Sequence, residues 1–382
     1  MMGCAYALIR GGRIVRSGAV GLADPRSGRR LRAHTPMRVA SISKVATALL
    51  VMKLMEDGRL SLDADIADLL GPWARNPAFP DAAIHVRMLL SHTSSMRDGA
   101  VYWAPLGART ADFFTPGAAL WEHGAHWDSA HAPGRSFTYC NLGFGVLGAI
   151  IERVCGARFD LFAHAALFGP LGLECGFNWS ECPPRFMARG SPIWQRAAAA
   201  DGLGPFEAQV DDPLPHGRVF LNPDNLPLTD YRLAENGTLF SPQGGLRASA
   251  RDLAAFGLLL LHEGAPLLRP ETMAAMQAAA WTFDGANGQT DGGYYSAHGL
   301  SLHIIAPSAQ SPLERQLGPL IGHAGDAYGL RGGVWVDPSR DAGFVFLFNG
   351  GPQDERRAPG ARSAFSRPEE IAMQLFYDAA IG

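Results

Sequence analysis

The chain has 382 residues, of which 47% are hydrophobic, so it can build a sizeable core in one large domain or in two or three smaller ones. The formal net charge of -3 at pH 7 and the lack of a basic stripe argue against a general nucleic-acid or anionic-membrane partner. Five cysteines at irregular spacing do not match the pattern of a disulfide framework or of a zinc site.

The start of the chain shows no secretory signal, because residues 1–10 lack a basic stretch followed by a long apolar run and a cleavage site. No apolar run approaches the roughly 20 residues that are needed to span a membrane. If the chain is complete, we expect a cytoplasmic protein with no membrane partner.

The predicted elements begin with two strands, 4–10 and 13–20, which Gly11 and Gly12 join as a hairpin. Helices are expected from near residue 41, at about 142–154, after Ser249, and at about 270–280 and 368–379. Strands are expected near the end of the chain, at 299–305, 332–336 and 343–348. Residues 172–240 show only an irregular pattern of proline and tryptophan.

Strands at both ends with helices between them indicate an α+β fold. We expect an antiparallel sheet formed by both chain termini and flanked by helices, with a largely helical middle subdomain. The whole chain, 1–382, is then a single domain, with an α/β part at about 1–60 and 285–382 and a helical, loop-rich part at about 61–284.

A serine and a lysine lie three residues apart near the start of the first predicted helix. Residues at this spacing share a helix face, so Ser41 and Lys44 can meet, whereas Ser43 points about a quarter-turn away from Lys44. A serine hydroxyl needs a nearby base to become a nucleophile, and lysine can serve if burial lowers its pKa. The N–H groups at a helix start can also stabilise an oxyanion.

The alternative is a helix-start serine followed by a solvated lysine. The chain contains only two lysines, Lys44 and Lys53, and arginine supplies nearly all of the remaining positive charge. Arginine cannot act as a base, so a lysine at this place favours the chemical interpretation.

Tyr139 and Asn141 lie just before the second long helix. The phenol could shuttle a proton, and the amide could hold a substrate amide or orient Lys44. A packed ring and a helix cap are the alternative.

His323 follows an apolar stretch, 317–321, that is predicted to be a strand. Gly325 would let a substrate approach the backbone closely, and the N–H groups beyond it, starting with Asp326, could complete an oxyanion hole. A structural histidine at a strand end is the alternative.

Two patterns in the middle of the chain indicate neither a nucleotide nor a metal site. The G-x-G-x-x-G run at 143–148 does not follow a buried strand, so close helix packing explains it better than a dinucleotide site. The acidic residues and histidines between 122 and 131 match no standard zinc spacing. We expect no metal and no cofactor.

The order Ser41-x-x-Lys44, Tyr139-x-Asn141, His323-x-Gly325 resembles the serine β-lactamase and penicillin-binding-protein superfamily, particularly its class C-like esterase and D-aminopeptidase branches. The segments 89–94 and 241–253 are also similar to those of the family. The resemblance covers nearly the whole chain and implies a single catalytic domain with the β-lactamase/transpeptidase-like fold.

The resemblance implies an acyl-enzyme mechanism, in which Ser41 attacks a carbonyl and Lys44 and Tyr139 share the proton transfer. Asn141 would contact the substrate, and the N–H groups of Ser41 and Asp326 would form the oxyanion hole.

The third motif departs from the family pattern. His323 and Ala324 stand where many members have a lysine and a threonine, which removes a permanent cation and a hydroxyl for binding a carboxylate. This departure favours an ester or amide substrate that is less anionic than a β-lactam.

We therefore expect a serine hydrolase, with a small-molecule ester as its substrate and carboxylesterase activity. A D-amino-acid peptidase or amidase, a weak β-lactamase and an acyltransferase share the same motifs. A catalytically silent binding protein on the same fold is a further alternative. The sequence does not indicate an oligomeric state.

Overall fold

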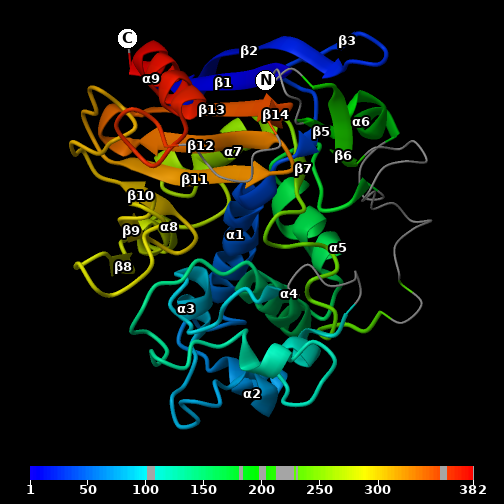
Figure 1. Cartoon of the computed structure of the whole chain (residues 1–382), viewed down its shortest axis with the longest axis vertical. Coiled ribbons are helices and arrows are strands. Elements are labelled where there is room, and N and C mark those ends of the chain that lie inside the picture. Colours follow the sequence, from blue (N-terminus) through cyan, green and yellow to red (C-terminus); the bar gives the residue numbers. More distant parts are fainter. Residues whose placement is uncertain are drawn as a thin grey trace.

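A nine-stranded sheet forms the centre of the computed structural model, which describes residues 1–100, 108–179, 184–197, 204–211, 228, 231–352 and 359–381. The strand order is β3-β2-β1-β13-β12-β11-β10-β9-β8 (Figure 1). These strands are β1 (Gly3–Arg10), β2 (Arg13–Asp24), β3 (Arg29–Arg30), β8 (Trp281–Thr282), β9 (Ala297–His298), β10 (His303–Ile305), β11 (Leu320–Ala327), β12 (Leu330–Asp337) and β13 (Ala342–Asn349). All neighbouring strands in this order are antiparallel.

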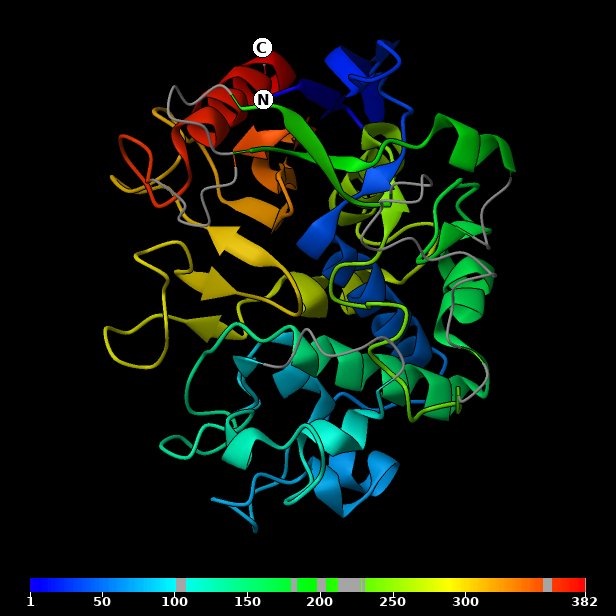
Figure 2. The same ribbon diagram turned by 45° about the vertical axis from the view of Figure 1, so that its right-hand side comes forward.

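The two ends of the chain meet inside this sheet. Strand β1 pairs with β13 from Gly3 opposite Asn349 to Arg10 opposite Ala342. Figure 2 shows both chain ends on the same side of the molecule, next to the orange strands and the red helix α9. The predicted α+β class, with an antiparallel sheet formed by both termini, is therefore confirmed.

Helices surround the sheet and fill the middle of the chain. They are α1 (Ser43–Glu56), α2 (Ile66–Leu70), α3 (Val86–Leu90), α4 (Leu142–Cys155), α5 (Phe159–Ala163), α6 (Pro184–Arg189), α7 (Ala250–Leu261), α8 (Pro270–Gln277) and α9 (Arg367–Ile381). Within the described ranges, no helix combines the length and the apolar character required to cross a membrane.

The central strand β13 is apolar on both faces because a helix covers each of them. Val345 and Leu347 face the core that contains α7, whereas Phe344 and Phe346 face the core that contains α9. The alternation follows from the two-residue period of a strand. A capping box between Ser249 and Asp252 starts α7 at the predicted place.

Helix α1 connects the sheet to the helical part of the chain (Figure 1). It contacts α4, α5, α8 and β11, so residues on all of its faces are buried, including Lys44. The sequence predicted this buried helix, but it begins later than expected. Ser41 lies in a 3-10 turn, η1 (Ala40–Ile42), and α1 begins only at Ser43.

The glycines of the G-x-G-x-x-G run allow α4 to pack closely, as the sequence predicted. A Cβ atom on Gly145 would lie 2.6 Å from Thr238, and one on Gly148 would lie 2.7 Å from the carbonyl oxygen of Gly237. Real Cβ atoms essentially never approach other atoms this closely, so a side chain at either position would force the neighbouring segment to move.

The expectation of an irregular segment over 172–240 is wrong in part. Strands β5 (Ile193–Arg196) and β6 (Phe206–Val210) form a hairpin, and β14 (Gly351–Pro352) pairs with β5. Strand β14 lies far from β5 in the chain, so no local pattern reveals this pairing.

A buried ion pair on strand β7 (Arg247–Ala248) lies next to the chain segment that leads into η1. This two-residue strand pairs with β4 (Met37–Arg38) just before η1. The guanidinium of Arg247 is fully buried, donates to both carboxylate oxygens of Asp211 at 2.8 and 2.5 Å, and also donates to the carbonyl of Gly245 at 2.7 Å. Removal of the carboxylate would leave a buried, uncompensated cation.

We therefore predict that Asp211→Ala lowers the free energy of unfolding by about 3–5 kcal/mol, as expected for breaking a buried ion pair. Chemical denaturation of wild type and variant measures this difference. The control is Asp57→Ala, which removes the exposed, 2.5 Å Lys53–Asp57 pair and should cost less than about 1 kcal/mol. Equal effects of the two substitutions would contradict the prediction.

Candidate active site

The turn that carries Ser41 packs directly against strand β11. A Cβ atom on Gly325 would lie 2.5 Å from the carbonyl oxygen of Val39 and 3.2 Å from the side chain of Ile42. The sequence suggested that Gly325 leaves room for a substrate. The structure gives a different reason, because the missing side chain lets η1 approach the strand.

Lys44 lies beneath Ser41 and is fully buried. Its amine nitrogen Nζ is 3.0 Å from Ser41 Oγ, 2.7 Å from Asn141 Oδ1 and 3.0 Å from the carbonyl oxygen of Gln243. Burial lowers the pKa of Lys44 to about 7, against a smaller opposing effect of the Asp98 carboxylate. A substantial fraction of this lysine is therefore neutral at neutral pH.

The contacts of Lys44 match a neutral amine. A neutral amine has two N–H groups and one lone pair, and the oxygens of Asn141 and Gln243 can only accept hydrogen bonds. When both N–H groups donate to these oxygens, the lone pair is left for the third contact, the hydroxyl of Ser41. The site can therefore take the proton of Ser41.

Asp98 sets the orientation of the Asn141 amide. Its Oδ2 accepts hydrogen bonds from the backbone N–H and from Nδ2 of Asn141, at 2.9 and 2.8 Å, and its Oδ1 accepts from the backbone N–H of Leu142 at 2.8 Å. Because a carboxylate only accepts, Nδ2 must face Asp98 and Oδ1 must face Lys44.

Tyr139 covers the other side of the Ser41–Lys44 pair. It shares a hydrogen bond with Ser41, and its ring centre is 4.8 Å from Lys44 Nζ. The rings of His92 and Tyr295 pack on it, with centroids at 4.4 and 5.2 Å. Burial raises the pKa of Tyr139, so the phenol keeps its proton at neutral pH and can donate it.

Buried, neutral histidines lie beside this site, where many members of the family have a lysine. His323 is only 3% exposed and lies within β11, not at the strand end that the sequence suggested. Burial lowers its pKa well below the usual value, and its Nδ1 is 2.6 Å from the carbonyl oxygen of Ala324, to which the neutral ring donates. Burial also lowers the pKa of His92 and of His298, so these rings are neutral as well.

Ser41 opens into two small pockets. One, of about 80 Å³, is also lined by Asn141, Gly244 and Tyr328. The other, of about 160 Å³, is also lined by Tyr139 and His323. Asp326 borders both. The structure thus brings together all predicted site residues, with Lys44 and Gly325 lying behind the pocket walls.

The residues between 122 and 131 do not assemble a metal site in the described part of the chain, where no group of three or more His, Cys, Asp or Glu side chains could hold a metal ion. His126 accepts the N–H of Gly99 at 3.0 Å and lies 3.2 Å from Glu122, and His131 lies 3.0 Å from Asp128. These side chains therefore make contacts within their own loop and do not converge on a metal position.

Sequence reasoning missed three contributors to the site. Asp98 stands 43 residues before Asn141, and no local pattern marks it. Gln243 contributes only a backbone carbonyl, so its residue type carries no signal. Tyr295 lies in a loop beyond α8, and its ring partners Tyr139 and Phe137 lie far earlier in the chain, so no local pattern marks it.

Comparison with known proteins finds a matching family model, related sequences and the same fold. A family model described as Beta-lactamase matches residues 1–367. Esterase EstB of Burkholderia gladioli is 29% identical over 349 residues, which cover 85% of this chain and 82% of that protein. A D-aminopeptidase of Cereibacter sphaeroides is 31% identical over 177 residues, which cover 45% of this chain and 32% of that protein.

Among solved structures, EstCE1, described as a hydrolase with promiscuous acyltransferase activity, aligns with a TM-score of 0.70 at 21% identity and covers 100% of this chain and 94% of that one. This likeness confirms the β-lactamase/transpeptidase-like fold. The family match includes every residue of the site described above. The chain therefore belongs to the beta-lactamase family and is a serine hydrolase.

Proposed function

We propose that this protein is a carboxylesterase that hydrolyses small esters through an acyl-enzyme on Ser41. The observation that carries the proposal is the neutral, buried amine of Lys44, whose nitrogen Nζ lies 3.0 Å from Ser41 Oγ. Similarity to esterase EstB over most of both chains supports the choice of an ester substrate.

In the first step, Ser41 Oγ attacks the ester carbonyl carbon while its proton moves to Lys44 Nζ. The carbonyl oxygen becomes an oxyanion, and the backbone N–H groups of Ser41 and Asp326 stabilise its charge. The proton passes through Tyr139 to the oxygen of the leaving alcohol as the carbon–oxygen bond breaks. The products of this step are the acyl-enzyme and the free alcohol.

Water then releases the acyl group. The water molecule gives a proton to the Lys44–Tyr139 pair, its oxygen attacks the acyl carbon, and the proton returns to Ser41 as the ester to the enzyme breaks. The free acid leaves, and Lys44 is again neutral.

The third motif favours esters over β-lactams. A β-lactam antibiotic carries a carboxylate, and the family pattern would present a lysine to bind it. Here the neutral imidazole of His323 takes that position, next to the exposed carboxylate of Asp326. The neutral ring supplies no cation for the carboxylate of a β-lactam, and Asp326 is already paired with Arg331 at 3.4 Å.

Two further activities share these residues. Similarity to a D-aminopeptidase over 45% of the chain keeps D-amino-acid amides as candidate substrates. The acyl-enzyme could also pass its acyl group to an alcohol instead of water. The rates with p-nitrophenyl acetate and with D-alanine amide, with and without an added alcohol, distinguish these activities.

We also propose that residues 1–382 form one catalytic domain, with the helical part supplying Tyr139 and Asn141 and the sheet supplying His323 and Asp326. The cytoplasmic location expected from the sequence remains a prediction.

Ser41→Ala should abolish both p-nitrophenyl acetate hydrolysis and labelling by a fluorescent phosphonate, because no other hydroxyl contacts the Lys44 amine in the described residues. The control is Ser43→Ala. Ser43 Oγ donates to the carbonyl of Ala40 at 2.6 Å and accepts the N–H of Leu246 at 2.9 Å, so this variant loses stability, by about 1–3 kcal/mol, and remains labelled. Equal labelling of wild type and Ser41→Ala would exclude Ser41 as the nucleophile and leave a silent binding protein.

The Lys44 amine should titrate near pH 7 in the folded protein. Because its pKa is lowered from the ordinary 10.5, the neutral base predominates above about pH 7, and kcat/KM should rise with pH through that value and then level off. NMR of ¹³Cε-labelled lysine measures the pKa directly, since the chain has two lysines and Lys53→Arg assigns the signals. A value near 10 would contradict the mechanism.

Asp98 should act as a positioning residue for Asn141 and Lys44. In Asp98→Asn the side chain keeps its size but loses the negative charge that opposes the lowering of the Lys44 pKa. We expect kcat/KM to fall roughly tenfold or more, as expected when one fixed hydrogen bond in a catalytic network is lost. The Lys44 NMR titration should move to lower pH, which loss of stability alone would not produce.

The control for this experiment is Asp57→Asn, which removes an exposed charge paired with Lys53 and should leave the Lys44 signal unchanged. If Asp98→Asn leaves the Lys44 titration in place, Asp98 has only a structural role.

A further inference from the structure

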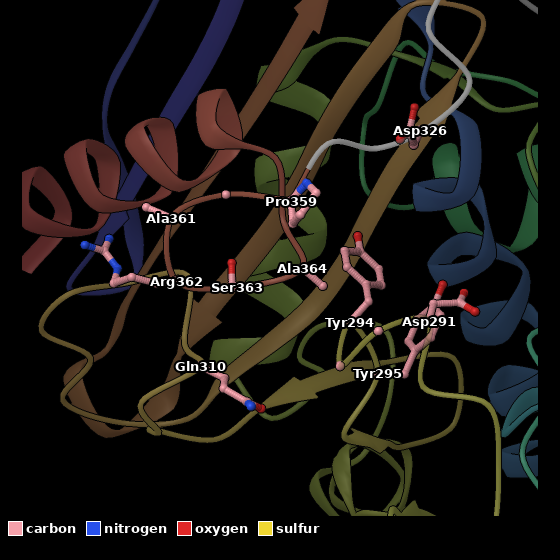
Figure 3. Close-up of a pocket in the computed structure, with 13 residues that line it drawn as sticks. Asp291, Tyr294, Tyr295, Gln310, Asp326, Pro359, Ala361, Arg362, Ser363 and Ala364 are labelled. Atoms are coloured by element: carbon pink, nitrogen blue, oxygen red, sulfur yellow. The ribbon is translucent and has the colours of Figure 1, made fainter.

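We propose that the ester lies across Ser41 with a short acyl group in the 80 Å³ pocket and a bulky, uncharged alcohol in a separate pocket of about 660 Å³ (Figure 3). This inference rests on the proposed esterase function and specifies its substrate class. It follows from the position of Tyr139, from the sizes of the pockets on its two sides and from the charges that line them.

The large pocket adjoins the site. Tyr294, Tyr295 and Asp326 line both this pocket and the 160 Å³ pocket that contains Ser41 and Tyr139. In Figure 3 the segment Pro359–Ala364, which leads into α9, lies opposite the two tyrosines. A group bound at Ser41 can therefore extend past Tyr294 and Tyr295 into the large pocket.

The position of Tyr139 decides which part of the ester faces this pocket. The leaving oxygen must receive a proton when the alcohol departs, and Tyr139 is the protonated group beside Ser41. Tyr139 lines the pocket that continues to Tyr294 and Tyr295. The alcohol must therefore point toward the large pocket, and the acyl chain toward the side of Asn141 and Gly244.

The pocket proposed for the alcohol is much larger than the pocket proposed for the acyl group. A pocket of about 660 Å³ lies in the range of roughly 300–1,000 Å³ that is typical of small-molecule sites, whereas 80 Å³ lies well below that range. The asymmetry predicts short-chain acyl esters of large alcohols, because the reverse arrangement would put the large group in the small space.

The walls of the large pocket favour an uncharged alcohol. Its lining includes the rings of Tyr294 and Tyr295 and the carboxylates of Asp291 and Asp326. The one arginine among the described lining residues, Arg362, donates to Glu314 at 2.6 Å and to the carbonyl of Pro312 at 3.2 Å, so its charge is already paired. The carboxylate of Asp326 is likewise paired, with Arg331 at 3.4 Å, so neither Arg362 nor Asp326 is left to compensate a charge on the alcohol.

Two isomeric esters test the orientation. Phenethyl acetate and methyl 3-phenylpropanoate have the same formula, but the first has a small acyl group and a bulky alcohol, and the second has the reverse. We expect kcat/KM for phenethyl acetate to be higher by roughly tenfold or more, as differences in pocket fit typically produce. A pH-stat measures both reactions on the wild-type protein.

Variants that fill the large pocket provide the second measurement. Ala364→Trp should lower the preference for phenethyl acetate over methyl 3-phenylpropanoate, and Gln310→Trp should act in the same direction from the opposite wall (Figure 3). The control is Ala275→Trp on the exposed side of α8, which should leave the preference unchanged. Two filling variants keep the test valid if one of them fails to fold.

Equal rates for the two isomers, or a preference for methyl 3-phenylpropanoate, would overturn the proposed orientation while leaving the esterase function intact. An unchanged preference in both folded filling variants would also overturn it. If the wild type hydrolyses neither isomer nor p-nitrophenyl acetate, the esterase function itself is wrong.

Discussion

The three contacts of the buried Lys44 amine are the constraint on which the rest of the site depends. Two of them are to oxygens that can only accept, on Asn141 and Gln243, and the third is to the hydroxyl of Ser41. A shift of the lysine pKa from 10.5 to about 7 costs about 4 kcal/mol of folding stability at pH 7. The packing of α1 against α4, α5, α8 and β11 must supply this free energy.

The same burial determines the protonation of a tyrosine and three histidines near Ser41. It keeps Tyr139 protonated, and it keeps His92, His298 and His323 neutral. The site therefore contains one proton acceptor and one proton donor but no fixed cation in the third motif. This combination suits an uncharged ester.

Most of the fold and the principal site residues could be predicted from the sequence. Regular spacing of apolar residues within one segment predicts the hairpin of β1 and β2, the capped helix α7 and the apolar strands β12 and β13. The pairs Ser41–Lys44 and Tyr139–Asn141 were visible because each lies within one short segment. Asp98 and Tyr295 were not visible, because their partners are far away in the chain and their own neighbours carry no pattern.

The sequence by itself determined which chemical groups are available: one lysine beside a serine, a tyrosine two residues before an asparagine, and a histidine where a cation is common. Only the tertiary structure decided how these groups act. Burial, which sets the Lys44 pKa, arises from the helices and the strand packed around α1. The direction of the Asn141 amide depends on Asp98, and the unequal pockets beside Ser41 depend on loops from distant parts of the chain. Such properties are set by contacts between distant segments, which local sequence patterns do not record.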